Sequence, residues 1–353
     1  MKHFAFPDIQ QFRQVIRNVS IRSHFVGLDA NGEPVYDSNK PMPVLKYHGT
    51  QKLHGTNSAI CLGSETGEIS LQSREQIITL EKDNAGFARF CSGIDLDKLF
   101  SMVEVLAPMP NGLLMQNDEE EDNEVKKHVI IYGEWCGGNI QKGVAISQLE
   151  KMFVIFAIKR FGMWLPKETV QKVKMTEQRV FNIHDFPSFD IEIDFNHPEI
   201  SQNKLGEITL AVENECPFGK AFGVTGIGEG VVWTCLNPDY QNSKFWFKVK
   251  GEKHSVSKVK TLAAVDIEKV NSINELIDKV VTENRMQQGV SVLKTNLHLP
   301  EIGREHTGDL IRWVVNDVIK EETDTITASG LTTKDLGGAV AKRVKEWFFK
   351  QGV

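Results

Sequence analysis

The sequence predicts an α+β protein, with an antiparallel-sheet domain over residues 1–255 followed by a small all-α domain over residues 260–353. Its 353 residues are enough for two domains with a core each. Short apolar runs bounded by glycine, asparagine and proline are typical of strands and fill the first part of the chain. After Lys250, apolar residues recur at the three- and four-residue spacing of amphipathic helices.

The expected elements follow from these patterns in chain order. Helices are predicted over residues 8–20 and 83–106, and later around residues 273–281, 310–319 and 336–348. Thr307 is the expected N-cap of the helix at 310–319. Strands are predicted over residues 44–48, 58–62, 69–73, 128–135, 153–158, 229–235 and 244–250. Residues 159–215 mix the patterns of strand, helix and loop without a clear order.

The composition is that of an ordinary globular protein, with 41% hydrophobic residues, 25% charged residues and a mean hydropathy of −0.26. No run approaches the roughly 20 apolar residues of a membrane span, and the first residues lack the apolar core of a secretory signal. The five cysteines are far apart and none lies in Cys-x-x-Cys, which argues against a structural zinc site. We therefore expect reduced, buried thiols, a cytoplasmic protein and no membrane partner.

The net charge of −6 argues against indiscriminate coating of nucleic acid but leaves room for a local basic groove. Residues 117–124 form a polar acidic run that contains Asp-Glu-Glu-Glu-Asp. Such a run is typical of a solvated loop, and a metal or polycation site is the alternative.

The stretch with the most chemical information contains Lys-x-His-Gly-Thr twice, once from Lys46 and once from Lys52. A lysine in this setting suits a covalent nucleotidyltransferase, because its amine can attack the α-phosphorus of a nucleotide and hold AMP or GMP as a phosphoramidate. A surface turn with incidental lysine and histidine is the alternative. Lys52 is the better candidate, because a glycine turn and an apolar strand come after it. Lys46 shares one strand face with His48 and is expected to be partly exposed.

Several distant residues could serve such a lysine. Lys248 and Lys250 alternate with apolar neighbours, so both ammonium groups face one side, where they could neutralise a phosphate and lower the pKa of the nucleophile. The alternative is an edge strand that uses lysine against aggregation. Glu134 ends one apolar strand and Glu229 begins another. One acid could accept ribose hydroxyls and the other could hold Mg²⁺ (or Mn²⁺), which prefers few protein carboxylates plus phosphate oxygens.

Two further side chains suit a nucleotide pocket. Phe156 lies in the middle of an apolar strand, where core packing is the ordinary role and stacking on a base is the alternative. Arg74 ends a strand and could contact phosphate or ribose with its guanidinium.

Together these residues form an ordered set that resembles the motifs of ATP-dependent RNA ligases, in particular the phage double-strand RNA ligases and the trypanosome RNA-editing ligases. The set consists of Lys52-Leu53-His54-Gly55-Thr56-Asn57, Arg74, Tyr132-Gly133-Glu134-Trp135, Phe153-Val154-Ile155-Phe156, Glu229-Gly230-Val231-Val232 and Lys248-Val249-Lys250. The resemblance covers residues 44–255 and implies a nucleotidyltransferase (ATP-grasp-like ligase) fold. The histidine in Lys-x-His-Gly favours this branch over DNA ligases and capping enzymes, which typically use aspartate.

The resemblance also implies roles. Lys52 becomes the lysyl-AMP and Glu229 supports the metal, while His54 and Asn57 act mainly in the later steps. The remaining residues are implied to bind ATP: Gln51 and Leu53 line the adenosine site, Arg74 and Glu134 contact phosphate and ribose, Phe156 stacks on adenine, and Lys248 and Lys250 bind the α-phosphate.

Three positions depart from the pattern. Gln51 stands where the phage enzymes have an acid, Ala157 stands where an aspartate is usual, and Thr234-Cys235 replaces a lysine. These departures bear on substrate preference more than on adenylylation.

The expected function is ATP-dependent sealing of 3′-hydroxyl and 5′-phosphate RNA ends, nicks in duplex RNA above all, through lysyl-AMP and RNA-adenylate, as in RNA repair. The alternatives are an adenylylating or capping nucleotidyltransferase that acts on another 5′-phosphate or diphosphate end, and a non-catalytic RNA-binding relative. The expected partners are ATP, Mg²⁺ or Mn²⁺, and RNA. The helical domain could orient a nick or bind another protein, and phage encoding is compatible with the likeness.

Overall fold

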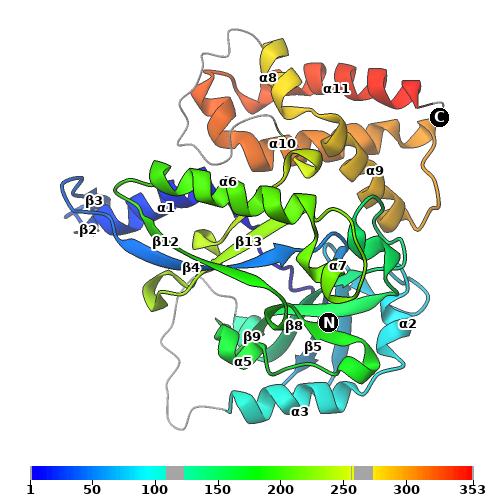
Figure 1. Ribbon diagram of the computed structural model, residues 1–353. Coiled ribbons are helices and arrows are strands. Elements are labelled where there is room, and N and C mark those ends of the chain that lie inside the picture. Colours follow the sequence, from blue (N-terminus) through cyan, green and yellow to red (C-terminus); the bar gives the residue numbers. More distant parts are fainter. Residues whose placement is uncertain (1, 109–122, 256, 258–272, 352–353) are drawn as a thin grey trace. The chain divides into compact units, whose positions relative to one another are not determined.

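The computed structural model describes residues 2–108, 123–255, 257 and 273–351 (Figure 1). Within the chain, contacts group the residues into two compact units. The sheet unit comprises Met1–Asp8, Lys46–Ile191 and Leu210–Ser243, and the helical unit comprises Ile9–Leu45, Glu192–Thr209 and Lys244–Val353. The α+β class with a helical C-terminal region is confirmed, whereas the domain boundary near residue 255 stays a prediction.

The sheet unit is built on a sheet whose strands run in the order β10-β9-β8-β5-β6-β7, with β11 also paired to β9. All neighbours are antiparallel except β11 and β9, which are parallel. The strands are β5 (Thr56–Gly63), β6 (Ile69–Ser73), β7 (Ile77–Ile78), β8 (His128–Cys136), β9 (Met152–Arg160), β10 (Met163–Trp164) and β11 (Val180–Asn182). A further antiparallel pair joins β4 (Val44–Lys52) to β13 (Gly230–Cys235), with Gly230 opposite Lys52.

Helices α2 (Phe87–Cys91) and α3 (Leu96–Leu106) cover one face of this sheet. The unit also contains α4 (Asn123–Lys126), α5 (Lys167–Val170) and α7 (Pro217–Ala221), whereas α6 (Glu199–Asn214) belongs to the helical unit up to Thr209. Phe87 and Leu99 of α2 and α3 pack with Ile131, Phe153 and Ile155 of the sheet in one apolar cluster. Because side chains alternate along a strand, Val154 and Phe156 face the other way, into a second cluster with Leu53 and Phe218. The candidate site lies on this second face.

The helical unit has its own core. Its elements are β1 (Gln10–Gln11), α1 (Phe12–His24), β2 (Phe25–Leu28), β3 (Pro34–Tyr36), β14 (Phe247–Lys250), α8 (Ile273–Val280), α9 (Glu283–Leu297), α10 (Thr307–Ala328) and α11 (Thr333–Lys350). Strand β12 (Ser188–Asp194) begins in the sheet unit and continues into the helical unit at Glu192. Apolar residues of α8 to α11, such as Leu276, Met286, Val314 and Val340, form one buried cluster. β1 pairs with β14 in parallel, and β2 pairs with β3 as a hairpin.

Several sequence-based boundaries were wrong. The helix predicted over residues 83–106 is two helices, because the chain turns through Ser92–Asp95 between them. The strand predicted over residues 44–48 continues to Lys52, and the strand predicted over residues 244–250 begins only at Phe247. Thr307 is the first residue of α10 and not its N-cap, which is His306. Most of the acidic run at 117–124 lies outside the described residues.

Two further expectations concern the cysteines and the membrane. All five cysteines are free and buried, as expected for reduced thiols. In the described part of the chain, no helix is both long and apolar enough to cross a bilayer.

Candidate active site

Lys52 is the last residue of β4, and its side chain remains about a quarter exposed. Its Nζ donates a hydrogen bond to Oε2 of Glu229 at 2.8 Å. The chain then passes through Leu53 and His54 to Gly55 and enters β5. A Cβ atom on Gly55 would lie 2.7 Å from Cβ of Cys136 and closer still to the backbone oxygen of Trp135, so only glycine fits where this turn crosses β8. The glycine of the motif therefore allows the close approach that fixes Lys52 at the strand end.

Glu229 is the acid that joins the lysine and the histidine of the second motif copy. It immediately precedes β13 and is 2% exposed. Its Oε2 accepts from Lys52 and also lies 3.1 Å from Nδ1 of His54. The register explains the meeting, because Gly230 lies opposite Lys52 across the β4–β13 pair. A buried carboxylate oxygen at this distance fixes the direction of the Lys52 amine, whose side chain is still about a quarter exposed.

A second carboxylate, Glu134 of β8, lies in the same cluster. Its Oε1 accepts the backbone N–H of Gly55 at 2.9 Å. Burial raises the pKa of Glu134 to about 7; the Lys52 ammonium opposes this rise and the charge of Glu229 adds to it. Asn57 of β5 lies directly opposite Glu134 in the β5–β8 register, so the two side chains share a face of the sheet.

The carboxylates fit a hard divalent cation only in part. Among the residues that the structure describes, no group of three or more His, Cys, Asp or Glu side chains is arranged to hold a metal ion. Glu229 and Glu134 supply oxygen donors, which Mg²⁺ and Mn²⁺ accept, and such ions commonly complete their shells with water and phosphate oxygens. The donor chemistry therefore fits a metal that arrives with a nucleotide.

The first motif copy has different surroundings. Lys46 is exposed, whereas His48 is buried, and its Nδ1 lies 2.8 Å from Oδ1 of Asp190 and 3.3 Å from Nζ of Lys167. A Cβ atom on Gly49 would lie 2.7 Å from the ring of Trp233. The first copy therefore contributes buried residues to β4. Lys52, and not Lys46, is hydrogen-bonded to Glu229.

The residues expected to line the adenosine site have well-defined partners. Gln51 points to the opposite face of β4 from Lys52, where its Nε2 donates to Sγ of Cys216 and its Oε1 accepts the backbone N–H of Phe218, both at 2.8 Å. Leu53 is buried in the second apolar cluster of the sheet unit. Phe156 is half-buried and packs edge-on against Phe6, with ring centroids 4.9 Å apart.

Two of the three basic residues expected at the phosphates, Arg74 and Lys248, form ion pairs with acids of the protein. Arg74 forms an ion pair with Asp8 at the surface of the sheet unit. Lys248 and Lys250 belong to the helical unit, where Phe247 and Val249 are buried and both lysines are half-buried, as the alternation predicted. Nζ of Lys248 lies 2.6 Å from Oε1 of Glu321 on α10.

Comparisons with known proteins decide the family. The profile of the RNA ligase family matches residues 45–250, which is more than half of the chain. The chain belongs to the RNA ligase family. The matched segment of this family member begins in β4, ends with β14, and includes Lys52, Glu134, Glu229 and Lys248.

Solved structures that match part of the chain include RNA ligase from Naegleria gruberi with pyrophosphate, at 15% identity and a TM-score of 0.42 over 71% of this chain and 56% of that chain. A variant of the same enzyme with ATP and Mn matches at 14% identity and 0.42, over 71% and 57%. Another variant, with AMP and Mn, matches at 15% and 0.42, over 72% and 58%. The chain thus spans a little over half the length of these structures. No curated protein sequence matches it.

Sequence reasoning missed the partners that this family member supplies from distant segments. Glu321 carries no signal in the sequence, because it lies just beyond the helix predicted over residues 310–319 and is one of several acids there. Arg13 reads as a solvent-facing residue of the first helix, yet it is 4% exposed. Cys216, which binds Gln51, is 165 residues away from it in sequence.

Proposed function

We propose that the protein is an ATP-dependent RNA ligase that joins a 3′-hydroxyl to a 5′-phosphate, with nicks in duplex RNA as its preferred substrate. One observation carries the proposal. In a chain of this family, Lys52 and His54 of the Lys-x-His-Gly motif lie against the same buried oxygen of Glu229, at 2.8 and 3.1 Å. This is the constellation that a positioned amine nucleophile needs, with an acceptor that orients it.

The reaction is proposed in three steps. The amine of Lys52 loses a proton, for which Oε2 of Glu229 is the adjacent acceptor, and attacks the α-phosphorus of ATP. An N–P bond forms, the bond to the β-phosphate breaks, and pyrophosphate leaves. The 5′-phosphate of the RNA then attacks the phosphorus of lysyl-AMP: a P–O–P anhydride bond forms, the N–P bond breaks, and the amine of Lys52 leaves and takes back the proton from Glu229. Finally, the 3′-hydroxyl attacks that phosphate, a phosphodiester forms, and AMP leaves with the electron pair of the broken anhydride bond.

The remaining roles follow the family pattern. Glu134 is proposed to accept from the ribose, Phe156 to stack on adenine, and His54 and Asn57 to act in the transfer to RNA. Gln51, Leu53 and Arg74 are proposed to complete ATP binding, and Lys248 and Lys250 to bind the α-phosphate. Glu229 is the side chain proposed to hold Mg²⁺ or Mn²⁺. Such an ion, when bound, neutralises charge that develops on the phosphate oxygens.

A substrate panel tests the proposal. The protein is incubated with labelled ATP and Mg²⁺, alone and with nicked duplex RNA, single-stranded RNA or nicked duplex DNA. We expect label on the protein without nucleic acid and sealed product mainly with nicked duplex RNA. Labelled protein without any sealing, or a labelled cap on a diphosphate end, would instead indicate an adenylylating or capping transferase. The absence of both label and sealing, with RNA bound, would indicate a non-catalytic RNA-binding relative.

A further inference from the structure

The half-buried lysine of β14 is already paired with an anion from the C-terminal helices. Nζ of Lys248 lies 2.6 Å from Oε1 of Glu321, and each side chain is about one-fifth exposed. The residues are 73 positions apart in sequence and lie in the same compact unit. A carboxylate at this distance from an ammonium occupies the position that a phosphate oxygen takes in a charge-assisted hydrogen bond.

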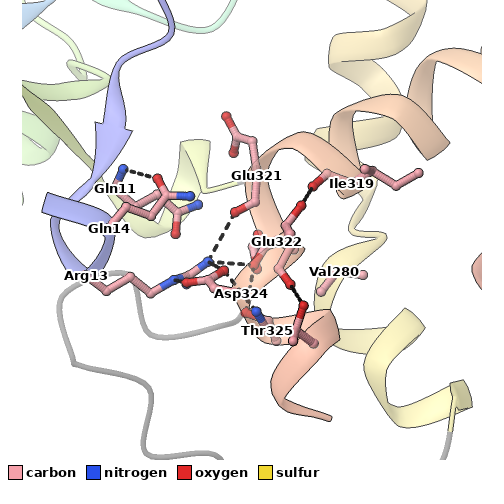
Figure 2. A network of polar contacts seen from close by, with 12 residues as sticks. Gln11, Arg13, Gln14, Val280, Ile319, Glu321, Glu322, Asp324 and Thr325 are labelled. Atoms are coloured by element: carbon pink, nitrogen blue, oxygen red, sulfur yellow. Dashed lines mark hydrogen bonds and ion pairs between the residues drawn. The ribbon is translucent and has the colours of Figure 1, made fainter. Parts of the chain in front are cut away.

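Glu321 is held in place by a kink in α10. Glu322, the next residue, has φ −122° and ψ 15° inside the helix, which is not a helical conformation. Arg13 of α1 clamps this turn, as Figure 2 shows: its Nη2 donates to the backbone oxygen of Glu321 at 3.2 Å and to Oε2 of Glu322 at 3.0 Å. Its Nε donates to Oδ2 of Asp324 at 2.6 Å. The side chain of Glu321 points away from Arg13, and its carboxylate is paired with Lys248.

A second buried arginine supports the same turn from α9. Nη2 of Arg285 lies 3.5 Å from both Oε2 of Glu321 and Oε1 of Glu322, and its Nε lies 2.9 Å from Oδ2 of Asp317. Burial alone would raise the pKa of Glu321, but Lys248, Arg285 and Lys250 outweigh it and hold that pKa well below its usual range. Glu321 is thus a fixed, charged anion next to Lys248.

We propose that Glu321 competes with the nucleotide phosphate for Lys248, so that ATP binding must displace an anion that belongs to the protein and thereby loosens α10. The inference rests on the proposed function, in which Lys248 binds the α-phosphate. It assigns the C-terminal helices a part in nucleotide binding, namely an inhibitory contact that binding must break.

The nucleotide phosphate and the Glu321 carboxylate are both negative and would both contact the Lys248 ammonium. A phosphate oxygen within hydrogen-bond distance of Lys248 lies within about 5 Å of the Glu321 carboxylate, unless that side chain moves. At that separation, repulsion between two unit charges changes an affinity by roughly fourfold in bulk water and by a few hundredfold at the dielectric constant typical near a protein surface, so about tenfold is a low estimate for this half-buried pair. Moving Glu321 instead requires the clamped turn to shift. In both cases, removing the charge should favour the nucleotide.

Calorimetry with a non-hydrolysable ATP analogue, carrying a methylene group between the α- and β-phosphorus, tests this on the full chain. Glu321→Gln is expected to bind about tenfold more tightly than the wild type at low salt. The matched control is Asp309→Asn, which removes one acid from the same helix about 18 Å away along its axis. The control is expected to bind within twofold of the wild type. In a Lys248→Ala background, Glu321→Gln should have no effect, because the shared cation is gone.

A second measurement uses the wild type alone and does not depend on how a variant folds. Hydrogen exchange of the α10 peptide around Glu321 is expected to speed up when the analogue binds. Unchanged affinity in Glu321→Gln, or unchanged or slower exchange in α10, would overturn the inference. If Lys248→Ala weakens binding while Glu321→Gln does nothing, only this inference fails. If the wild type does not bind the analogue, or Lys248→Ala has no effect, the proposed function of Lys248 fails with it.

Discussion

Replacing Arg13 with methionine should destabilise the helical unit strongly. The Arg13 side chain is 1% exposed and donates to three residues of one turn of α10, including Glu322, whose side chain is fully buried. Methionine keeps the apolar stem but leaves the Glu322 carboxylate buried with a weaker set of partners. Removing one member of a buried ion pair costs about 3–5 kcal/mol. Because Arg285 still lies 3.5 Å from Glu322, we expect the lower end, about 3 kcal/mol.

The assay is urea unfolding followed by circular dichroism, with Arg312→Met as the matched control. Arg312 is on the same helix, is 74% exposed, and pairs with Asp309 at the surface. Exposed pairs of this kind contribute about 0–1 kcal/mol, so the control should unfold close to the wild type. Adding Glu322→Gln to Arg13→Met should recover part of the loss, because the buried charge is then removed as well. A loss below about 1 kcal/mol for Arg13→Met would refute the reasoning, because it would mean that the buried acid needs no such partner.

Three further predictions concern the sheet unit and the thiols. Gly49→Ala should lower the free energy of unfolding by about 1–3 kcal/mol, because the new methyl group would lie 2.7 Å from the Trp233 ring. The control is Gly206→Ala, whose methyl group would have no atom within 4 Å and should not destabilise the protein. Chemical denaturation of both variants measures the difference. Glu134→Gln should raise the free energy of unfolding at pH 8 and change it little at pH 4. The pKa of Glu134 is about 7 against an ordinary 4.5, so the folded wild type contains the costly buried charge at pH 8 and not at pH 4. A variant that is less stable than the wild type at pH 8 would contradict this. The five buried cysteines should react with a thiol reagent only after denaturation, and fast labelling of the native protein would show that this expectation is wrong.

Two local features of the site, the alternation along β14 and the glycine turn of the second motif, could be predicted from the sequence because neighbouring residues alone determine them. Alternating burial along β14 and the glycine turn after His54 both follow from period-two geometry and from the space that Gly55 needs. The choice of Lys52 over Lys46 also rested on local grounds, namely the glycine turn and apolar strand that come after Lys52 alone. The structure adds that Glu229 lies beside Lys52, which the register of two strands determines.

The partners of charged residues could not be predicted in the same way. Lys248 and Glu321, or Arg13 and Asp324, meet only because segments 73 and 311 residues apart pack together. Composition and periodicity give each residue a face of its own element but say nothing about which opposing face it meets. The kink at Glu322 could not be predicted from the sequence either, because no proline or glycine lies there. Glu322 is instead contacted by Arg13 and Arg285, which come from distant segments.

Gln51 has hydrogen-bond partners that the sequence does not reveal. The family resemblance implied that it lines the adenosine site, and in the structure its side chain points to the opposite face of β4 from Lys52. Its amide is hydrogen-bonded to Cys216 and to the backbone of Phe218. A role for Gln51 in base recognition therefore stays a prediction, and this structure indicates that the residue supports the wall of the site.

We expect the covalent bond to AMP to form on Lys52. The most direct test is peptide mass spectrometry of the wild type after incubation with ATP and Mg²⁺, together with Lys52→Ala and Lys46→Ala. We predict AMP on the peptide that contains Lys52, no adduct in Lys52→Ala, and an undiminished adduct in Lys46→Ala. AMP on Lys46, or an adduct that persists in Lys52→Ala, would contradict the account.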